Sequence, residues 1–555
     1  MIVIQGVCGS MPLDDAFGLL NGADITLYQA VGWSVRIKCD KSHLIVASDE
    51  ALVVGDRSST FSSENPLLRN GAFLVFEDWG GGTLKVTTDR LATIPLYYVA
   101  KNGVVFFSSR LVDLVRVAGG AVSGLGALQW ALLGQPLEAV TPVRDVALVP
   151  PATIGIFTPQ GYVPQREYWC AWVNEKNDGV LGDYLDDGIA VLEYAHRRAL
   201  EDVSLDAVYA LPVTGGLDSR CNLAIHPELI DKSVLFHTDD LGNFELPIAR
   251  DIARYLGGDL HIFKAADWMD NVTEIDLSIE TGEFNAAHWR LVGSAQRLAA
   301  DYGCTTTVDG FFQDFLFKAS FLTQIEPGRI FEKSLNSALY RAKLLDVDVS
   351  SPGFREMVES LSESIFTASN GLAASQKYYM RNRSRRLVYN IVRLNQNFLD
   401  VRTPGIDNDL MEFGLNLPWN LRSNAFFYKN MISRLDSGLA RIRYDKSGLP
   451  LLARREKSFS RRFKTYFLRN LNHIIPNRTF MLDTETSFGR AFRKSPEFRS
   501  RVGEFVDRSE WCEEVFGRAV IERLESQRRR GRPVEDVVGV LVTLAALELQ
   551  GNRKA

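Results

Sequence analysis

The spacing of hydrophobic positions changes along the chain and predicts two different kinds of structure. In the first third, short apolar runs are separated by clusters of glycine, aspartate, asparagine and serine, a pattern typical of strands joined by turns. The clearest runs are Met1–Ile4, Leu44–Ala47, Ala72–Phe76, Thr83–Thr87 and Val104–Ser108. We therefore predict a domain rich in β-structure over residues 1–170.

From about Asp206 onward, apolar strands alternate with helical segments. The predicted strands are Asp206–Val213, Ser233–His237, Leu260–Phe263 and Thr305–Val308, and the predicted helices are Glu245–Leu256 and Ala286–Tyr302. Repeated β–α units of this kind predict a parallel, doubly wound sheet. From about Ser334 to the end the pattern is mainly helical, so residues 185–555 are assigned to a second domain.

Composition excludes several classes of partner. The chain has 555 residues, of which 46% are hydrophobic and 24% charged, and its net charge is −5. This balance gives no electrostatic case for binding nucleic acid or a membrane surface. The apolar stretch Val537–Leu549 is too short to span a bilayer and contains Glu548, so we expect a buried helix there. The stretch 454–469 is basic and aromatic, and an amphipathic helix with a solvated basic face explains it better than a nucleic-acid site does.

The cysteines and the first residues indicate a cytoplasmic protein. The six cysteines are scattered, without a C-x-x-C pair, and are interpreted as reduced thiols that bind no zinc. The start, MIVIQGVCGS, has no basic segment before an apolar stretch, so no secretion signal is expected. The sequence does not indicate an oligomeric state.

The most informative segment joins a predicted strand to a predicted helix. It contains Thr214, Gly215, Gly216, Leu217, Asp218 and Ser219. Backbone N–H groups and the helix dipole bind anions at such a junction, and glycine lets the main chain approach phosphate oxygens. Thr214 and Ser219 add hydroxyl donors, whereas Asp218 beside a phosphate is best explained by Mg²⁺. The Walker spacing and its lysine are absent, and the alternative is a Gly-Gly turn that merely precedes a helix.

A second candidate loop follows another strand of the same predicted sheet. It begins at Gly310 and contains Asp314. Because the ends of parallel strands face the same crevice, Asp314 could reach a Mg²⁺ ion that Asp218 holds. The alternative is that Asp314 only stabilises the start of its own helix.

Taken together, these segments resemble the asparagine synthetase family, which includes β-lactam synthetases and lasso-peptide cyclases. The loop at 214–219 resembles the family's (S/T)-G-G-x-D-S motif, and Gly310, Phe312, Asp314 and Phe315 align with its G-x-G-x-D-E motif. The segment 89–98 resembles the family's D-R-x-G-x-x-P-L-Y-Y pattern. The segment 105–110 resembles the strand that follows this pattern in the family. The segments 141–151 and 167–169 resemble the end of that domain, and 400–407 resembles E-x-R-x-P-F-L-D.

The resemblance implies a fold and a chemistry. The fold is an α+β N-terminal glutamine-amidotransferase-like (Ntn) sandwich, followed by an α/β PP-loop ATP pyrophosphatase domain with a helical C-terminal part. In the implied reaction, ATP and Mg²⁺ adenylate a small-molecule or peptide carboxylate with release of pyrophosphate. The acyl group is then transferred to an amine or ammonia, and AMP is released. Residues 441–446 resemble the segment with an active-site lysine, so Lys446 would stabilise negative charge at the reacting centre, unless it is a surface lysine.

The sequence also departs from the family in two places. The glutaminase nucleophile of the family is an N-terminal cysteine, but position 2 is Ile2 and Cys8 lies within the first predicted strand. We therefore expect a degenerate glutaminase domain and a substrate amine or ammonia as donor, with a glutamine-dependent asparagine synthetase as an alternative. Phe312 and Phe315 replace the second glycine and the glutamate of the G-x-G-x-D-E motif. This keeps open a second alternative, a catalytically silent nucleotide-binding scaffold of a biosynthetic complex.

Overall fold

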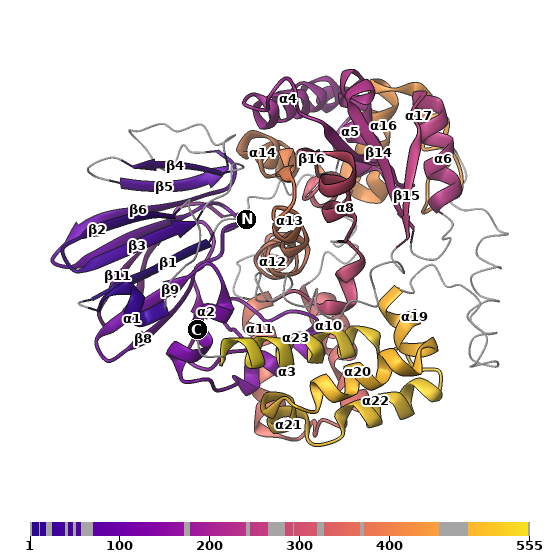
Figure 1. Cartoon of the computed structure of the whole chain (residues 1–555). Helices are drawn as coiled ribbons and strands as arrows, with labels where there is room; N and C mark the ends of the chain where they lie inside the picture. The colour runs from indigo at the N-terminus through magenta and orange to yellow at the C-terminus, as the bar shows by residue number, and fades with distance from the viewer. Residues whose placement is uncertain are drawn as a thin grey trace.

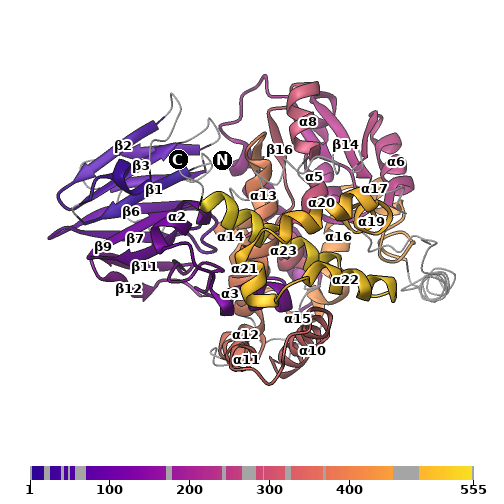
Figure 2. The same cartoon turned by 60° about the horizontal axis from the view of Figure 1, so that its bottom comes forward.

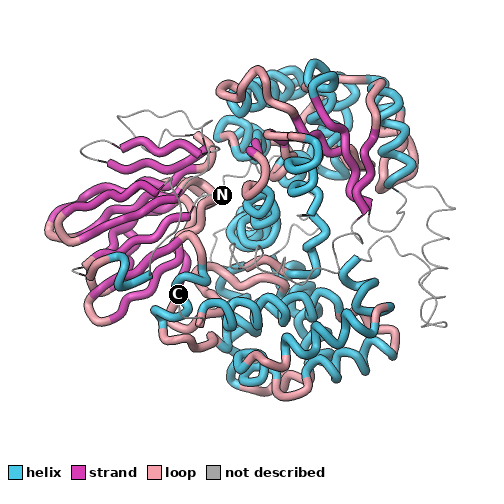
Figure 3. Tube along the Cα trace, in the orientation of Figure 1, coloured by secondary structure: helices cyan, strands magenta, loops and turns pink. Residues whose placement is uncertain are grey.

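A computed structural model of the chain shows antiparallel sheets in the N-terminal part and a parallel sheet with many helices after it (Figure 1; Figure 3). The structure describes residues 3–9, 11–17, 25–38, 43–47, 51–56, 70–170, 178–239, 245–264, 283–291, 293–318, 327–366, 371–453 and 487–552. The expected mixture of α and β structure, with this order along the chain, is thus confirmed.

Two six-stranded antiparallel sheets form the N-terminal part. The first has the order β10 (Ala147–Leu148), β8 (Tyr97–Lys101), β9 (Val104–Ser108), β1 (Val3–Cys8), β3 (Trp33–Lys38) and β2 (Ile25–Ala30). The second has the order β12 (Gly161–Glu167), β11 (Thr153–Thr158), β7 (Thr83–Thr88), β6 (Phe73–Gly80), β5 (Ala51–Asp56) and β4 (His43–Ala47). The Phe107 ring of the first sheet stacks on Phe157 of the second, with centroids 5.1 Å apart. The two sheets therefore share one apolar layer.

The second part is built on a five-stranded parallel sheet. Its order is β15 (Leu260–Lys264), β14 (Ser233–Asp239), β13 (Tyr209–Pro212), β16 (Thr306–Val308) and β17 (Asp400–Arg402), and every neighbouring pair is parallel. The four strands predicted from the sequence are confirmed. The edge strand β17 was not predicted, because its three residues interrupt a region whose spacing is otherwise helical.

The helix predicted over Ala286–Tyr302 is wrong in one respect. A 3₁₀-helix, η5 (Ala286–Leu291), precedes a separate α-helix, α8 (Gly293–Tyr302). The Ala286 N–H donates to the Thr543 hydroxyl and the Ala287 N–H donates to the Asn285 side chain. Such side-chain hydrogen bonds compete with the helical pattern and favour a tighter turn.

Helices surround the parallel sheet and make up most of the C-terminal part (Figure 2). Those within or before the sheet region are α1 (Leu13–Phe17), α2 (Leu111–Ala118), α3 (Gly124–Leu133), α4 (Gly182–Leu200), α5 (Asp218–Ile225), η2 (Pro227–Lys232), α6 (Glu245–Leu256) and α9 (Gln313–Lys318). Later come α10 (Pro327–Leu345), α11 (Pro352–Phe366), α12 (Gly371–Tyr378), the π-helix η7 (Tyr379–Val388), α13 (Tyr389–Asn395), η8 (Pro404–Ile406), α14 (Asn408–Asn416), α15 (Trp419–Arg422), η9 (Ser423–Ala425), α16 (Phe426–Leu435) and α17 (Ser437–Arg441). The last are α19 (Ser487–Lys494), α20 (Pro496–Val506), α21 (Glu510–Phe516), α22 (Val520–Arg529) and α23 (Glu535–Gly551).

The final helix, α23, is buried as the sequence predicted. Every residue from Val537 to Glu548 is buried, and the Glu548 carboxylate accepts hydrogen bonds from the Ser509 hydroxyl and the Trp511 N–H. The helix packs against α2 of the N-terminal part, and one apolar cluster extends from Val7 to Leu547. Among the described residues, no helix is long and apolar enough to cross a membrane. The predicted basic helix at 454–469 lies outside the described residues.

Candidate functional site

The candidate anion-binding loop lies at the carboxyl end of β13, the central strand of the parallel sheet. The strand is apolar and buried through Leu211, and Val213 extends its pairing by donating its N–H to the Phe236 carbonyl, 2.7 Å away. The chain then turns, and α5 begins at Asp218 after Leu217, which is fully buried. Within the described part of the chain, no side chain caps this helix start. Its first N–H groups are therefore placed to bind an anion.

The hydroxyl groups of the loop hold its turn together. The Thr214 and Ser219 hydroxyl oxygens are 2.8 Å apart, and the Gly216 N–H donates to Thr214 Oγ1. A Cβ at position 215 would lie 2.8 Å from Asp445 Cβ. Gly215 is therefore required where the loop passes the segment that contains Asp445 and Lys446.

Arg220, on the first turn of α5, fixes that neighbouring segment. Its side chain is fully buried, and its guanidinium donates to the carbonyls of Leu439, Ile442 and Arg443 at 2.7 to 2.9 Å. In addition, the Asp445 N–H donates to the Gly215 carbonyl at 3.1 Å. The loop and the segment after α17 therefore form one unit, although they are more than two hundred residues apart in sequence.

The second candidate loop follows β16, which pairs directly with β13. A Cβ at position 310 would lie 2.6 Å from Asp218 Cβ, so Gly310 lets the two loops touch. Gln313, which is fully buried, cross-links them, because its Nε2 donates to Asn222 of α5 and its Oε1 accepts a hydrogen bond from Tyr428. Asp218 and Asp314 therefore lie at the same end of the sheet, at the starts of the helices that follow two adjacent strands.

The charges around Asp218 act on one another. Burial, followed by the charge of Asp218, raises the pKa of Asp314 to about 6, and the same two causes raise the pKa of Asp309 to about 6. Lys318, at the end of α9, donates to Asp218 Oδ2 at 2.5 Å. The charges of Asp218 and Asp314 raise the pKa of Lys318 despite its burial. Three carboxylates, those of Asp218, Asp309 and Asp314, therefore act on one another next to the buried Lys318 ammonium.

The residues present fit a magnesium ion that arrives with a phosphate ligand. Asp218 Oδ1 is buried without a hydrogen-bond partner among the described residues. Within the same ranges, no group of three or more histidine, cysteine, aspartate or glutamate side chains has metal-binding geometry. Mg²⁺ commonly takes one or two carboxylates and completes its shell with water and substrate phosphates, so Asp218 and Asp314 are a sufficient protein contribution.

Lys446 lies next to this unit but points largely into solvent. Its side chain is 75% exposed, and its Nζ is 3.6 Å from Asp445 Oδ2. The pKa of Asp445 is raised by burial. The sequence-predicted lysine is thus near the anion-binding loop without being buried in the crevice, whereas Lys318 contacts Asp218 directly.

Two phenylalanines of the second loop, Phe312 and Phe315, stabilise each other. Phe312 has φ = 71°, the left-handed region that favours glycine, and its ring stacks on Phe315 with centroids 4.8 Å apart. A left-handed conformation costs a non-glycine residue about 1–2 kcal/mol. The stacked, fully buried pair offsets this cost, so the loop keeps a glycine-type backbone without glycine.

Sequence reasoning missed several residues of the crevice: Lys318, Asp309, Arg220, Tyr428 and Arg383. Arg383 lies on the π-helix η7, and its charge acts to lower the pKa of Asp314. None of these residues belongs to a recognisable local motif. The only sequence signal was that Asp309 and Lys318 flank Asp314 in the segment 308–318.

Substituting Gly310 tests the contact between the two loops. We expect Gly310→Ala to displace the Asp218 side chain, because the new Cβ would have to occupy space 2.6 Å from Asp218 Cβ. The free energy of unfolding should fall by about 1–3 kcal/mol, as for other overpacked sites. Urea unfolding provides the measurement, with Gly328→Ala as the control, because a Cβ at position 328 would meet nothing within 4 Å and the backbone there is not left-handed. Equal stability of Gly310→Ala and wild type would contradict the contact.

The raised pKa of Asp314 predicts a pH-dependent effect on stability. A carboxyl group whose pKa is raised by folding binds its proton more tightly in the native state, so its contribution to stability is lost as pH rises from about 4 to about 6. Asp314→Asn should therefore be more stable than wild type above pH 6 in magnesium-free buffer, by about 1–2 kcal/mol after allowance for solvent screening. Chemical denaturation at pH 4 and pH 7 measures this difference, and a gain that is larger at pH 4 would contradict the assignment.

No protein-family model matches the chain, and no curated protein matches it significantly. The geometry of the crevice and the motifs themselves are therefore the basis for any functional assignment.

Proposed function

We propose that the protein is an ATP-dependent ligase that adenylates a carboxylate and joins it to an amine or to ammonia, with release of AMP and pyrophosphate. The observation that carries this proposal is the contact between the loop at 214–219 and the loop at 309–314 on adjacent parallel strands. This contact places an uncapped helix start and two interacting aspartates in one crevice.

In this proposal each loop has a defined task. The N–H groups after Thr214, together with the Thr214 and Ser219 hydroxyl groups, bind the pyrophosphate part of ATP. Asp218 and Asp314 hold Mg²⁺, which would neutralise charge on the phosphates as the α–β bond breaks. Lys318 would give up its ion pair with Asp218 to a bound metal. Lys446, whose Nζ lies 3.6 Å from Asp445 Oδ2, would stabilise negative charge on the acyl-adenylate.

The backbone also supports the resemblance to the asparagine synthetase family. The family patterns have glycine at the positions that Ala92 and Phe312 occupy, and these residues have φ = 45° and 71°. Both positions thus keep the left-handed conformation that glycine favours. Under this proposal the N-terminal sheets are an Ntn-type sandwich and the parallel sheet is that of a PP-loop ATP pyrophosphatase.

The nitrogen donor in this proposal is not glutamine. Cys8 is buried in β1, its Sγ is 3.2 Å from the Gly82 carbonyl, and burial raises its pKa to about 11. A thiol that is protonated at neutral pH and closed off by two sheets is a poor nucleophile. A substrate amine or ammonia is the donor that agrees with this environment.

A second candidate function is a nucleotide-binding scaffold without catalysis. It is favoured by the ion pair between Lys318 and Asp218, since the ammonium occupies one oxygen of the carboxylate that would hold the metal. The two candidates differ in whether AMP appears when nucleotide is bound.

The direct test is AMP formation from ATP with a panel of carboxylic acids, each combined in turn with ammonium, free amines or glutamine. The proposed ligase produces AMP and pyrophosphate in equal amounts with an amine or ammonium and shows no gain from glutamine. Nucleotide binding without AMP in every combination would support the scaffold instead.

A further inference from the structure

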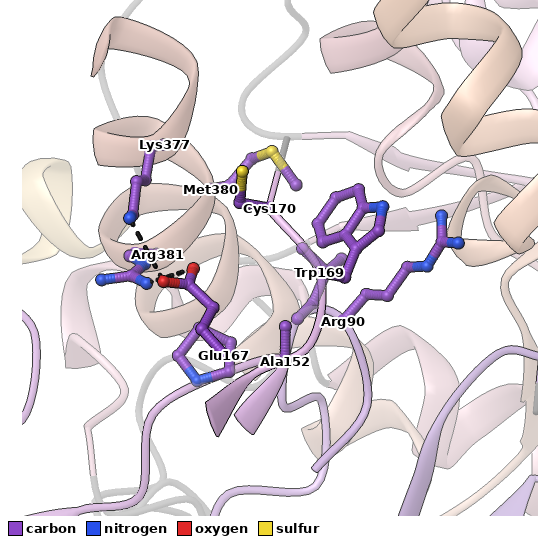
Figure 4. A pocket seen from close by; sticks show the side chains of 10 residues that line it. Arg90, Ala152, Glu167, Trp169, Cys170, Lys377, Met380 and Arg381 are labelled. Carbon is purple, nitrogen blue, oxygen red and sulfur yellow. Dashed lines mark hydrogen bonds and ion pairs between the residues drawn. The ribbon is translucent and has the colours of Figure 1, made fainter. Parts of the chain in front are cut away.

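Two cavities lie between the N-terminal sheets and the helices around η7, and they differ in their charge. The larger, shown in Figure 4, has about 290 Å³ of empty space and includes Arg90, Glu167, Trp169, Lys377 and Arg381 in its lining. Glu167 pairs with both Lys377 and Arg381, and Arg90 pairs with Glu412. The charges of this cavity are therefore matched by partners of opposite sign.

The smaller cavity has an excess of positive charge. It has about 220 Å³ of empty space, and its polar lining includes Thr93, Tyr97, Glu283, Arg385, Arg386 and Arg393. The lining thus contains three guanidinium groups and one carboxylate. The Glu283 carboxylate already forms an ion pair with Arg386, which donates to it from both Nε and Nη2. Each of these two side chains is only 1% exposed.

Arg385 has the clearest need for a further partner. The residue is 5% exposed, and its Nη2 donates to the Val149 carbonyl at 2.6 Å. Its Nε is buried and has no hydrogen-bond partner among the described residues. Burial and the neighbouring Arg386 lower the pKa of Arg385 to about 10, so the group still carries its charge at neutral pH. A buried charge of this kind normally has a counter-ion.

A further acid whose charge acts on Arg385 is Asp89, and its carboxylate already has hydrogen-bond partners within the protein. The Asp89 carboxylate accepts hydrogen bonds from the Thr93 hydroxyl and from the N–H groups of Phe73, Leu91 and Thr93. Its charge acts on Arg385 from a distance, but it does not line the cavity. The Tyr97 hydroxyl remains neutral, since burial and the charge of Glu283 raise its pKa, and a neutral hydroxyl can donate to an anion.

We propose that this cavity binds one small monovalent anion of halide or formate size, held by Arg385 and the Tyr97 hydroxyl. Only about 10 Å³ of this cavity can admit the centre of a water-sized molecule, which excludes nucleotides and most metabolites. Tyr97 belongs to β8 of the N-terminal sheets and Arg385 to η7 of the helical part. The anion therefore links the N-terminal sheets to the helical part of the chain.

The proposal predicts a saturable effect of chloride on stability. The melting temperature of the full-length protein is measured while sodium gluconate, whose anion is too large to enter, is replaced by sodium chloride at constant ionic strength. Wild type should gain about 1–3 °C and then reach a plateau, because binding to the native state alone stabilises by mass action. Arg385→Gln should lose this gain, whereas Arg254→Gln, which removes the same charge from an exposed position on α6, should keep it.

Sodium bromide and sodium formate define the anion further. A gain with chloride, bromide and formate supports a site that selects by size and charge, and a gain with chloride and bromide but not formate supports a site of halide size. Equal gains in wild type and Arg385→Gln, or a linear response without a plateau, would overturn the proposal.

A second measurement avoids dependence on the folding of the variant. Wild-type crystals grown in bromide should show an anomalous difference peak beside Arg385 Nε. Ordinary water density in the cavity without an anomalous signal would overturn the proposal even if Arg385→Gln does not fold.

Discussion

Replacing Asp218 by asparagine is expected to reduce AMP formation by about 10³-fold while the protein stays folded. The carboxylate is the only side chain that contacts Lys318 and also presents a buried oxygen without a hydrogen-bond partner among the described residues. A metal ion contributes several kcal/mol to the stabilisation of a phosphoryl-type transition state, and each 1.4 kcal/mol or so is a factor of ten in rate. Asparagine keeps the shape of the side chain and removes the charge that holds the ion.

The matched control is Asp301→Asn, which removes a carboxylate from an exposed ion pair on α8. This variant should retain wild-type rates, and circular dichroism should show that both variants are folded. Turnover by Asp218→Asn within tenfold of wild type would end the assignment of Asp218 as a metal ligand.

Replacing Arg220 by methionine is expected to lower the free energy of unfolding by about 3–5 kcal/mol. The methionine side chain fills similar volume but leaves the carbonyls of Leu439, Ile442 and Arg443 without their donor in a buried environment. Each buried polar group that loses its partner costs about 1–3 kcal/mol. Urea unfolding measures this loss.

The same variant should also separate Lys446 from the anion-binding loop. Limited proteolysis of Arg220→Met should therefore cut near residues 443–449 sooner than in wild type. Arg254→Met provides the control, since its guanidinium is 76% exposed and contacts Asp251 on the same helix. Unchanged stability and an unchanged cleavage rate would show that Arg220 does not hold the segment in place.

The sequence predicted the parts of the fold in which local pattern and tertiary structure agree. The strands of the parallel sheet are short, apolar and followed by helices, and the order of strand, glycine loop and helix around Asp218 could be predicted from spacing alone. The buried helix at Val537–Leu549 was predicted because its apolar run is too short to span a bilayer and contains Glu548, and its residues from Val537 to Glu548 are buried.

The parts that could not be predicted depend on contacts between distant segments. Lys318 was overlooked because only the folded arrangement brings its ammonium to Asp218, one hundred residues away. Arg220 was overlooked because its partners are backbone carbonyls, which have no sequence signature. The left-handed Phe312 depends on a stack with Phe315 that a motif comparison records only as two departures from the pattern.

The account depends most on the claim that Asp218 and Asp314 hold one divalent cation beside the anion-binding loop. The most direct measurement is anomalous diffraction from crystals that contain Mn²⁺ and an ATP analogue with a methylene group between the α and β phosphorus atoms. The account predicts one manganese peak bound by both carboxylates, with the β-phosphate on the N–H groups at the start of α5. A nucleotide bound elsewhere, or a manganese ion that contacts neither aspartate, would contradict it.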